Sequence, residues 1–81
     1  MTLADAIADL TAKIAAASPE AVIRVTRASD EEAAIRAYAP ADHEAAIKGA
    51  TNEQTIKLLM EDGLDIQVFV YDITTSLPPD E

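Results

Sequence analysis

The chain has a single histidine, and it lies between two carboxylates in the run Asp42-His43-Glu44. Histidine titrates near neutral pH and neighbouring carboxylates favour its protonated form, so these residue types suit general acid–base chemistry. Consecutive residues on a helix do not face one another, however, and Asp42 is placed to begin a helix. We therefore interpret His43 as a solvated side chain in the first turn of that helix, not as a catalytic base.

No pattern in the sequence predicts a nucleophile, a phosphate loop or a metal site. Nucleophilic catalysis needs a base beside the hydroxyl, and Ser18, Ser29 and Ser76 are all distant in sequence from His43. The chain has two glycines, too few for a phosphate-binding loop, and no cysteine to hold zinc. The acidic groups at 30–32 and 61–65 lack the alternating oxygen ligands of a calcium loop. We predict that the protein is not an enzyme and uses no cofactor or metal, and the sequence identifies no small-molecule substrate.

The charge of the chain limits the partners that it can bind. Fifteen acidic residues against six basic ones give a net charge of -9 over 81 residues, and residues 61–81 contain no basic residue. This balance disfavours non-specific binding to nucleic acid or to an anionic membrane, although it leaves room for a local basic patch. The N-terminus has no positive charge before its first apolar residues, and no apolar run is long enough to span a bilayer. We expect a cytoplasmic protein with no membrane contact.

The elements that must position any site follow from periodicity. Leu3, Ile7, Leu10 and Ile14 form one apolar stripe of a helix that begins near Thr2 and ends at Ser18-Pro19. The β-branched run 21–27 predicts a strand. The run 32–39 is ambiguous, because alanine and glutamate favour a helix while its alternation favours a strand. We predict a strand, since the triplets Ile23-Arg24-Val25 and Ile35-Arg36-Ala37 fit the two arms of an antiparallel hairpin.

The second half of the chain predicts two helices and a strand. After Pro40, a short helix is expected through Lys48 and to end at Gly49. A capping box, Thr51 with Gln54, then predicts a second helix to Gly63, whose expected buried stripe is Ile56, Leu59 and Met60. The run 64–73 alternates without a break and predicts a strand, and residues 74–81 form an acidic, proline-containing tail.

The predicted fold is α+β, in the order helix-strand-strand-helix-helix-strand, with a three-stranded sheet and helices on one face. We expect one domain over residues 1–73, because a chain of this length can build a single compact core. A domain this small and without disulfides has a thin margin of stability, so oligomerisation is an expected source of support.

This order of elements resembles the type II KH domain, above all the small stand-alone bacterial KH RNA-binding proteins. The end of a strand, an Ala-Pro pair and the first helix of that family are similar to the stretch Tyr38-Ala39-Pro40-Ala41-Asp42 through Ala46-Ile47-Lys48-Gly49. Its second helix, glycine turn and last strand are similar to Thr55-Ile56-Lys57-Leu58-Leu59, Gly63 and Ile66-Gln67-Val68. The resemblance implies binding of single-stranded RNA.

The KH signature that clamps nucleic acid departs from the family pattern in this sequence. KH domains use a Gly-x-x-Gly loop between the two helices, and here Lys48-Gly49-Ala50-Thr51-Asn52 has only the first glycine. The resemblance therefore implies a degenerate RNA-binding site, in which Lys48, Gly49 and Lys57 would contact the nucleic acid.

A second candidate surface follows from alternation along the strands. If Ile35 and its apolar neighbours point to the helices, five aromatic and arginine side chains point to the other face of the sheet: Arg24, Arg36, Tyr38, Phe69 and Tyr71. Such a face could stack RNA bases, but the same residue types are enriched at protein interfaces, including sheet-to-sheet homodimers. A register shifted by one residue in the last strand would instead place Phe69 and Tyr71 in the core.

From these residues we predict a small non-catalytic interaction domain that self-associates or docks a protein through this face of the sheet. The alternative is a degenerate KH-like RNA-binding protein that uses Lys48, Gly49 and Lys57. In either case the sequence leaves the identity of the partner open.

Overall fold

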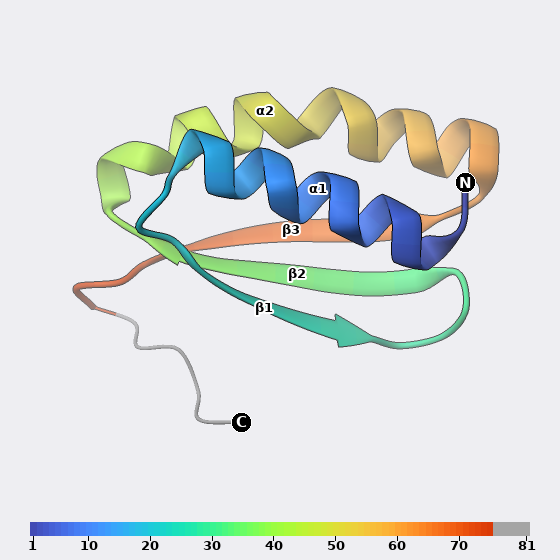
Figure 1. Cartoon of the computed structure of the whole chain (residues 1–81), viewed down its shortest axis with the longest axis horizontal. Coiled ribbons are helices and arrows are strands. Elements are labelled where there is room, and N and C mark those ends of the chain that lie inside the picture. Colours follow the sequence, from blue (N-terminus) through green and yellow to red (C-terminus); the bar gives the residue numbers. More distant parts are fainter. Residues whose placement is uncertain (76–81) are drawn as a thin grey trace.

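The computed structural model describes residues 1–75 and contains two helical segments and a three-stranded sheet (Figure 1). Helix α1 (Leu3–Ala17) is followed by the strands β1 (Val22–Arg27) and β2 (Glu32–Ala39). A 3-10 turn, η1 (Ala41–His43), leads into α2 (Glu44–Lys57), which continues as a wider π-helical turn, η2 (Leu58–Asp62). Strand β3 (Asp65–Asp72) completes the fold. The α+β class is confirmed, with two helices where three were expected.

Helix α1 and the hairpin form as the sequence predicts. The Thr2 hydroxyl accepts a hydrogen bond from the Asp5 amide at 3.2 Å and so caps the first turn of α1. The run 32–39 is a strand, and it pairs antiparallel with β1 in the predicted register, with Arg24 opposite Arg36.

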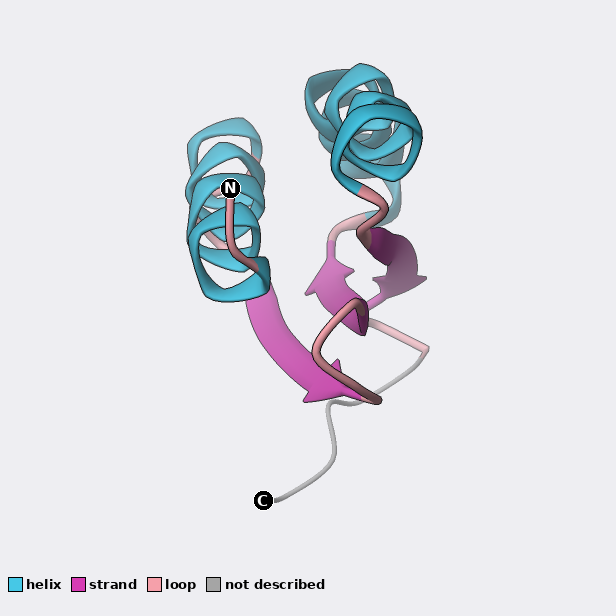
Figure 2. Cartoon of the chain, turned by 90° about the vertical axis from the view of Figure 1, so that its right-hand side faces the viewer, coloured by secondary structure: helices cyan, strands magenta, loops and turns pink. Residues whose placement is uncertain are grey.

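The sheet has the order β1-β2-β3, so that β2 is central and β3 lies at an edge. Strand β3 runs parallel to β2, because α2 carries the chain back across one face of the sheet before β3 begins. Both helices lie on that same face (Figure 2). The core lies between the helices and the sheet, where Leu10, Ile14, Ile35 and Ile47 are fully buried.

The helix break expected at Gly49 is wrong, because α2 runs through it without interruption. Gly49 keeps a negative φ, and the one glycine with a positive φ is Gly63, at 67°, where the helical segment ends. Thr51 does not cap a new helix, since its buried hydroxyl donates to the Ile47 carbonyl one turn earlier, at 3.0 Å. Gln54 does not complete a capping box either: its side-chain amide donates to the Asp9 carboxylate of α1 at 2.8 Å and accepts from the Lys13 ammonium.

The buried stripe expected for this helix is also wrong. Ile56, Leu59 and Met60 are 51%, 52% and 80% exposed, and the residues that pack inward are Ile47, Thr51 and Leu58. These three share one side of a continuous helix, whereas the expectation assumed a helix that started anew at Thr51. The exposed apolar residues therefore lie on the flank of α2.

Among the described residues, no helix has the length and apolar character needed to cross a membrane. Of the expected tail, Thr74 and Thr75 lie in a turn after β3, and residues 76–81 lie outside the described residues.

Candidate functional site

Strand alternation places the five predicted side chains on the face of the sheet opposite the helices. We call this set the sheet-face surface: Arg24, Arg36, Tyr38, Phe69 and Tyr71. The pairing register aligns them in two rows across the strands, one with Arg24, Arg36 and Phe69, and the next with Tyr38 and Tyr71. The register shifted by one residue is excluded, because Ile66 is buried while Phe69 and Tyr71 are exposed.

The aromatic side chains of this surface differ in exposure. The rings of Tyr38 and Tyr71 stack with their centroids 5.2 Å apart and their planes 21° apart. Tyr38 lies on the central strand and is only 6% exposed, so it presents little of its own ring. Phe69 and Tyr71, on the edge strand, are 42% and 38% exposed. An incoming partner would therefore meet two aromatic side chains, of which Tyr71 is already held by its stacking on Tyr38.

Arg36 lies at the centre of the sheet-face surface. One terminal nitrogen of its guanidinium donates to the Thr26 hydroxyl of β1 at 2.9 Å, which fixes the side chain along the sheet. Its Nε is buried and has no hydrogen-bond partner among the described residues. A buried donor without an acceptor is costly.

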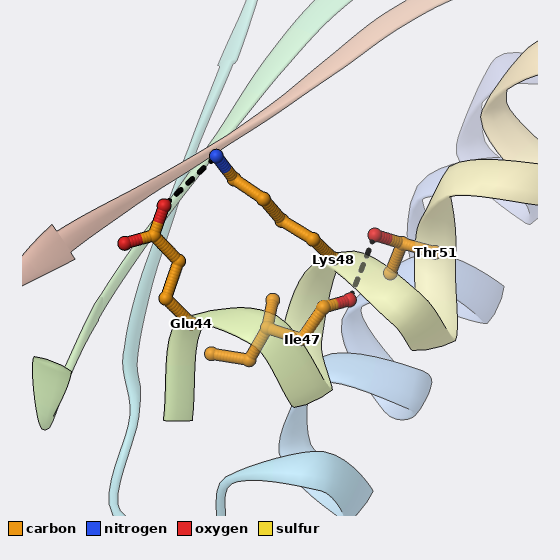
Figure 3. A network of polar contacts seen from close by, with 4 residues as sticks. All are labelled: Glu44, Ile47, Lys48 and Thr51. Carbon is orange, nitrogen blue, oxygen red and sulfur yellow. Dashed lines mark hydrogen bonds and ion pairs between the residues drawn. The ribbon is translucent and has the colours of Figure 1, made fainter. Parts of the chain in front are cut away.

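The residues predicted for nucleic-acid binding lie elsewhere, on α2. Lys48 pairs with Glu44 at 2.9 Å and Lys57 with Glu61 at 3.9 Å, each one turn away along the helix. Figure 3 shows the first of these pairs beside the Thr51 to Ile47 hydrogen bond that keeps the helix continuous. Lys48 and Lys57 are nine residues apart, which at about 100° per residue places them on opposite sides of α2. The structure does not bring these two cations together.

A groove of about 600 Å³ runs between α2 and β3. Lys48, Gly49 and Asn52 line it at the start of α2, and Ile56 and Leu59 line it farther along the helix. Residues 65–68 of β3 form its other wall. Lys48 and Gly49 therefore belong to this groove, whereas the sheet-face surface lies on the other side of the sheet.

The structure also brings Ser18 and His43 into contact, although they are far apart in the sequence. The Ser18 hydroxyl, just after α1, lies 2.7 Å from Nδ1 of His43, just before α2. The interpretation of His43 as a freely solvated side chain is wrong, since this hydrogen bond fixes its ring and the residue is half-buried. Ser18 is fully buried, so its hydroxyl meets no solvent and is not presented to a substrate. No local signal could have revealed a contact across 25 positions of sequence.

Replacing Ser18 by alanine is expected to lower the free energy of unfolding by about 1–2 kcal/mol, because it removes a part-buried hydrogen bond and leaves the His43 nitrogen without its partner. Urea denaturation followed by circular dichroism measures this. Ser29→Ala is the matched control: Ser29 is exposed and accepts only a local bond from the Glu31 amide. Equal losses for the two variants would contradict a clamp between Ser18 and His43.

The carboxyl group that ends β3 is held in its charged form. The pKa of Asp72 lies below its ordinary value, because the Thr74 hydroxyl and, with a smaller effect, the Thr74 backbone amide donate hydrogen bonds to the carboxylate.

Within residues 1–75, no three His, Asp or Glu side chains lie close enough to share a metal ion.

The fold and the surface define a small α+β domain whose sheet carries an aromatic and arginine face opposite its two helices. Comparisons with protein-family models, with curated proteins and with solved structures find no match to the chain.

Proposed function

We propose that the chain is a small, non-catalytic interaction domain that docks a protein partner through the sheet-face surface. One observation carries the proposal: Phe69 and Tyr71 expose their rings beside Arg36 on the one face of the sheet that neither helix covers. Aromatic residues and arginine are the types most enriched where protein interfaces hold their binding energy.

The surface is preorganised for such a partner. The stacking of the Tyr38 and Tyr71 rings and the bond from Arg36 to Thr26 hold these side chains before anything binds. Side chains that are already ordered lose little freedom on binding, so more of the contact energy remains as affinity. The positive charge of the Arg36 guanidinium favours a partner segment that carries a carboxylate.

The arrangement of polar groups elsewhere supports a non-catalytic role. Within residues 1–75, the one serine and histidine pair that the structure brings together has its serine fully buried. A nucleophile must reach the substrate in order to act.

Binding of RNA through a KH-like site is the alternative, since aromatic and arginine side chains on a sheet also stack bases. Two observations favour the protein partner. Lys48 and Lys57, the cations expected to bind phosphate, each pair with a glutamate on the same helix. The net charge of -9 also repels a polyanion over the rest of the surface.

Photo-crosslinking tests the proposal with a photoreactive phenylalanine analogue in place of Phe69, in the cells that make the protein. We expect one protein to be crosslinked, and Arg36→Glu to reduce that crosslink roughly tenfold or more. Lys57→Glu makes the same change of charge on the opposite side of the molecule and is expected to leave the crosslink intact. Circular dichroism of both variants verifies that they are folded.

The purified domain then provides the second arm. A peptide from the crosslinked segment should bind the wild type, bind Arg36→Glu much more weakly, and lose affinity as salt rises. A labelled random single-stranded RNA that binds instead, and is released by Arg36→Glu, would overturn the protein proposal in favour of the RNA one. A wild type that gives no crosslink from position 69 would show that the surface is not the docking site, and a crosslink that persists in Arg36→Glu would show that Arg36 does not contribute to binding.

A further inference from the structure

The outer edge of β3 has the features of a strand that pairs with another strand. Because β3 is the last strand of the sheet, only one of its edges is bonded to β2. It is eight residues long, and between Asp65 and Asp72 it has no charged residue, proline or glycine. Natural edge strands are usually shortened, or protected by charge, proline or a bulge, because exposed backbone groups invite pairing.

The opposite edge of the sheet differs from it. Strand β1 is shorter, with six residues, and carries Arg24 and Arg27. The Arg24 guanidinium donates to the Ile23 carbonyl of its own strand at 3.2 Å. Cationic side chains of this kind discourage another strand from approaching. The two edges are therefore unequal, and β3 is the one left open.

The helix layer is incomplete on the same side. The wall of α2 above the β3 edge carries Ile56 and Leu59, which are about half exposed. In the strand below, Val68 faces the helices but is only partly buried. A groove with an apolar flank at Ile56 and Leu59 thus lies directly against an unpaired strand edge, and one partner that adds both a strand and an apolar helix flank would cover both.

The charge of this region identifies the partner. The groove contains one cationic residue, Lys48, and one anionic residue, Asp65, so its lining is neutral in a protein with a net charge of -9. Two copies of an acidic protein repel least where neutral surfaces meet. The chain itself also supplies both required parts, an open strand and an apolar helix flank, on one side.

Antiparallel pairing of two β3 strands satisfies these conditions together. Asp65 and Asp72 lie on opposite faces of the strand, because they are an odd number of residues apart. In the joined sheet all four helices lie on one side, so two residues that are directly opposite each other across the joint point to the same face. Asp65 and Asp72 point to different faces and therefore cannot be opposite each other. A two-fold axis near Val68 or Phe69 also keeps each aspartate away from its own copy.

We infer that the chain forms a two-fold homodimer in which two β3 edges pair antiparallel and build one six-stranded sheet, with Ile56 of α2 and Leu59 of η2 from both copies covering the joint. This inference concerns a different surface from the proposed function and does not depend on it. The sheet-face surfaces of both copies stay open on the other side of the continuous sheet. The dimer would then present its partner with two docking surfaces at a fixed spacing.

Sedimentation equilibrium of the full chain over a range of concentrations, at low and at moderate salt, tests the dimer. We expect a dimer that tightens as salt rises, because salt screens the repulsion between two acidic copies. Leu59→Glu is expected to weaken dimerisation roughly tenfold or more, since it places a charge in the apolar joint. Met60→Glu is the matched control: it makes the same change one residue away, at a position that is 80% exposed and outside the groove. It should leave the dissociation constant nearly unchanged.

Hydrogen exchange of the wild type supplies a measurement that needs no variant. Backbone amides of β3 that point to its outer edge should exchange slowly at high concentration and faster on dilution, while the amides of β1 should not respond. A monomer at every concentration would overturn the inference. So would a dimer that Arg36→Glu breaks and Leu59→Glu does not, because it would assemble through the sheet-face surface. Loss of partner binding with the dimer intact would count against the proposed function alone.

Discussion

Replacing Ile35 by alanine is expected to lower the free energy of unfolding by about 2–5 kcal/mol. Ile35 is fully buried on the central strand, where its side chain meets the helix layer. A domain of this size has a total stability of roughly 4–12 kcal/mol, at about 0.05–0.15 kcal/mol per residue. The variant is therefore expected to lose a large fraction of the stability of the domain, which urea denaturation followed by circular dichroism would measure.

Val25→Ala is the internal reference for that loss. Val25 lies directly opposite Ile35 in the hairpin and faces the same layer, but it is only partly buried because it is on the edge strand β1. We expect a loss about half as large or smaller, since fewer contacts and a smaller cavity are involved. A loss at Val25 equal to that at Ile35 would contradict a core centred on β2.

The strands could be predicted because their signal is local. In β3 each residue alternates between a buried and an exposed face, and the alternation of side-chain type states this directly. The run 32–39 is a strand despite its alanines, because small side chains at Ala33, Ala37 and Ala39 allow the helices to pack closely on the central strand. The match of the two hairpin triplets predicted this from the sequence.

The continuity of α2 through Gly49 could not be predicted, because two side chains that could cap a new helix hydrogen-bond to other groups instead. Thr51 and Gln54 have the spacing of a capping box, but the Thr51 hydroxyl bonds within the helix and the Gln54 amide bonds to Asp9 of α1. Which partner a side chain takes depends on where α1 packs, and that information is not local. The wrong prediction that Ile56 and Leu59 are buried has the same cause, since a continuous helix turns a different side to the core.

The candidate surfaces divide in the same way. Alternation alone assigned the face of all five residues in the sheet-face surface, yet it did not predict that Tyr38 is 6% exposed or that its ring stacks on that of Tyr71 from the neighbouring strand. The groove beside β3 could not be predicted, because it needs both the edge position of the strand and the continuous α2. A surface whose residues follow from alternation along strands can be predicted from the sequence, whereas a surface that forms between two packed elements cannot.

Ala50→Pro is expected to lower the free energy of unfolding by about 3 kcal/mol or more. Ala50 lies in the interior of α2, so proline would remove a hydrogen bond within the helix and its ring would clash with the carbonyl of the preceding turn. The Ala50 side chain is exposed, which separates this loss from any change in core packing. Thermal and urea denaturation of the variant beside the wild type measure it.

Gly49→Ala makes the opposite prediction at the neighbouring position. Gly49 has a negative φ, and a Cβ added there would meet nothing within 4 Å, so alanine is expected to stabilise the helix by about 0.5–1 kcal/mol. A loop between two helices, as in a KH signature, would tolerate proline at 50 better and would lose stability or RNA binding when its glycine is replaced. The signs of the two changes together therefore distinguish a continuous α2 from a nucleic-acid loop: a stabilising alanine with a damaging proline supports the helix, and the reverse pair would restore the loop.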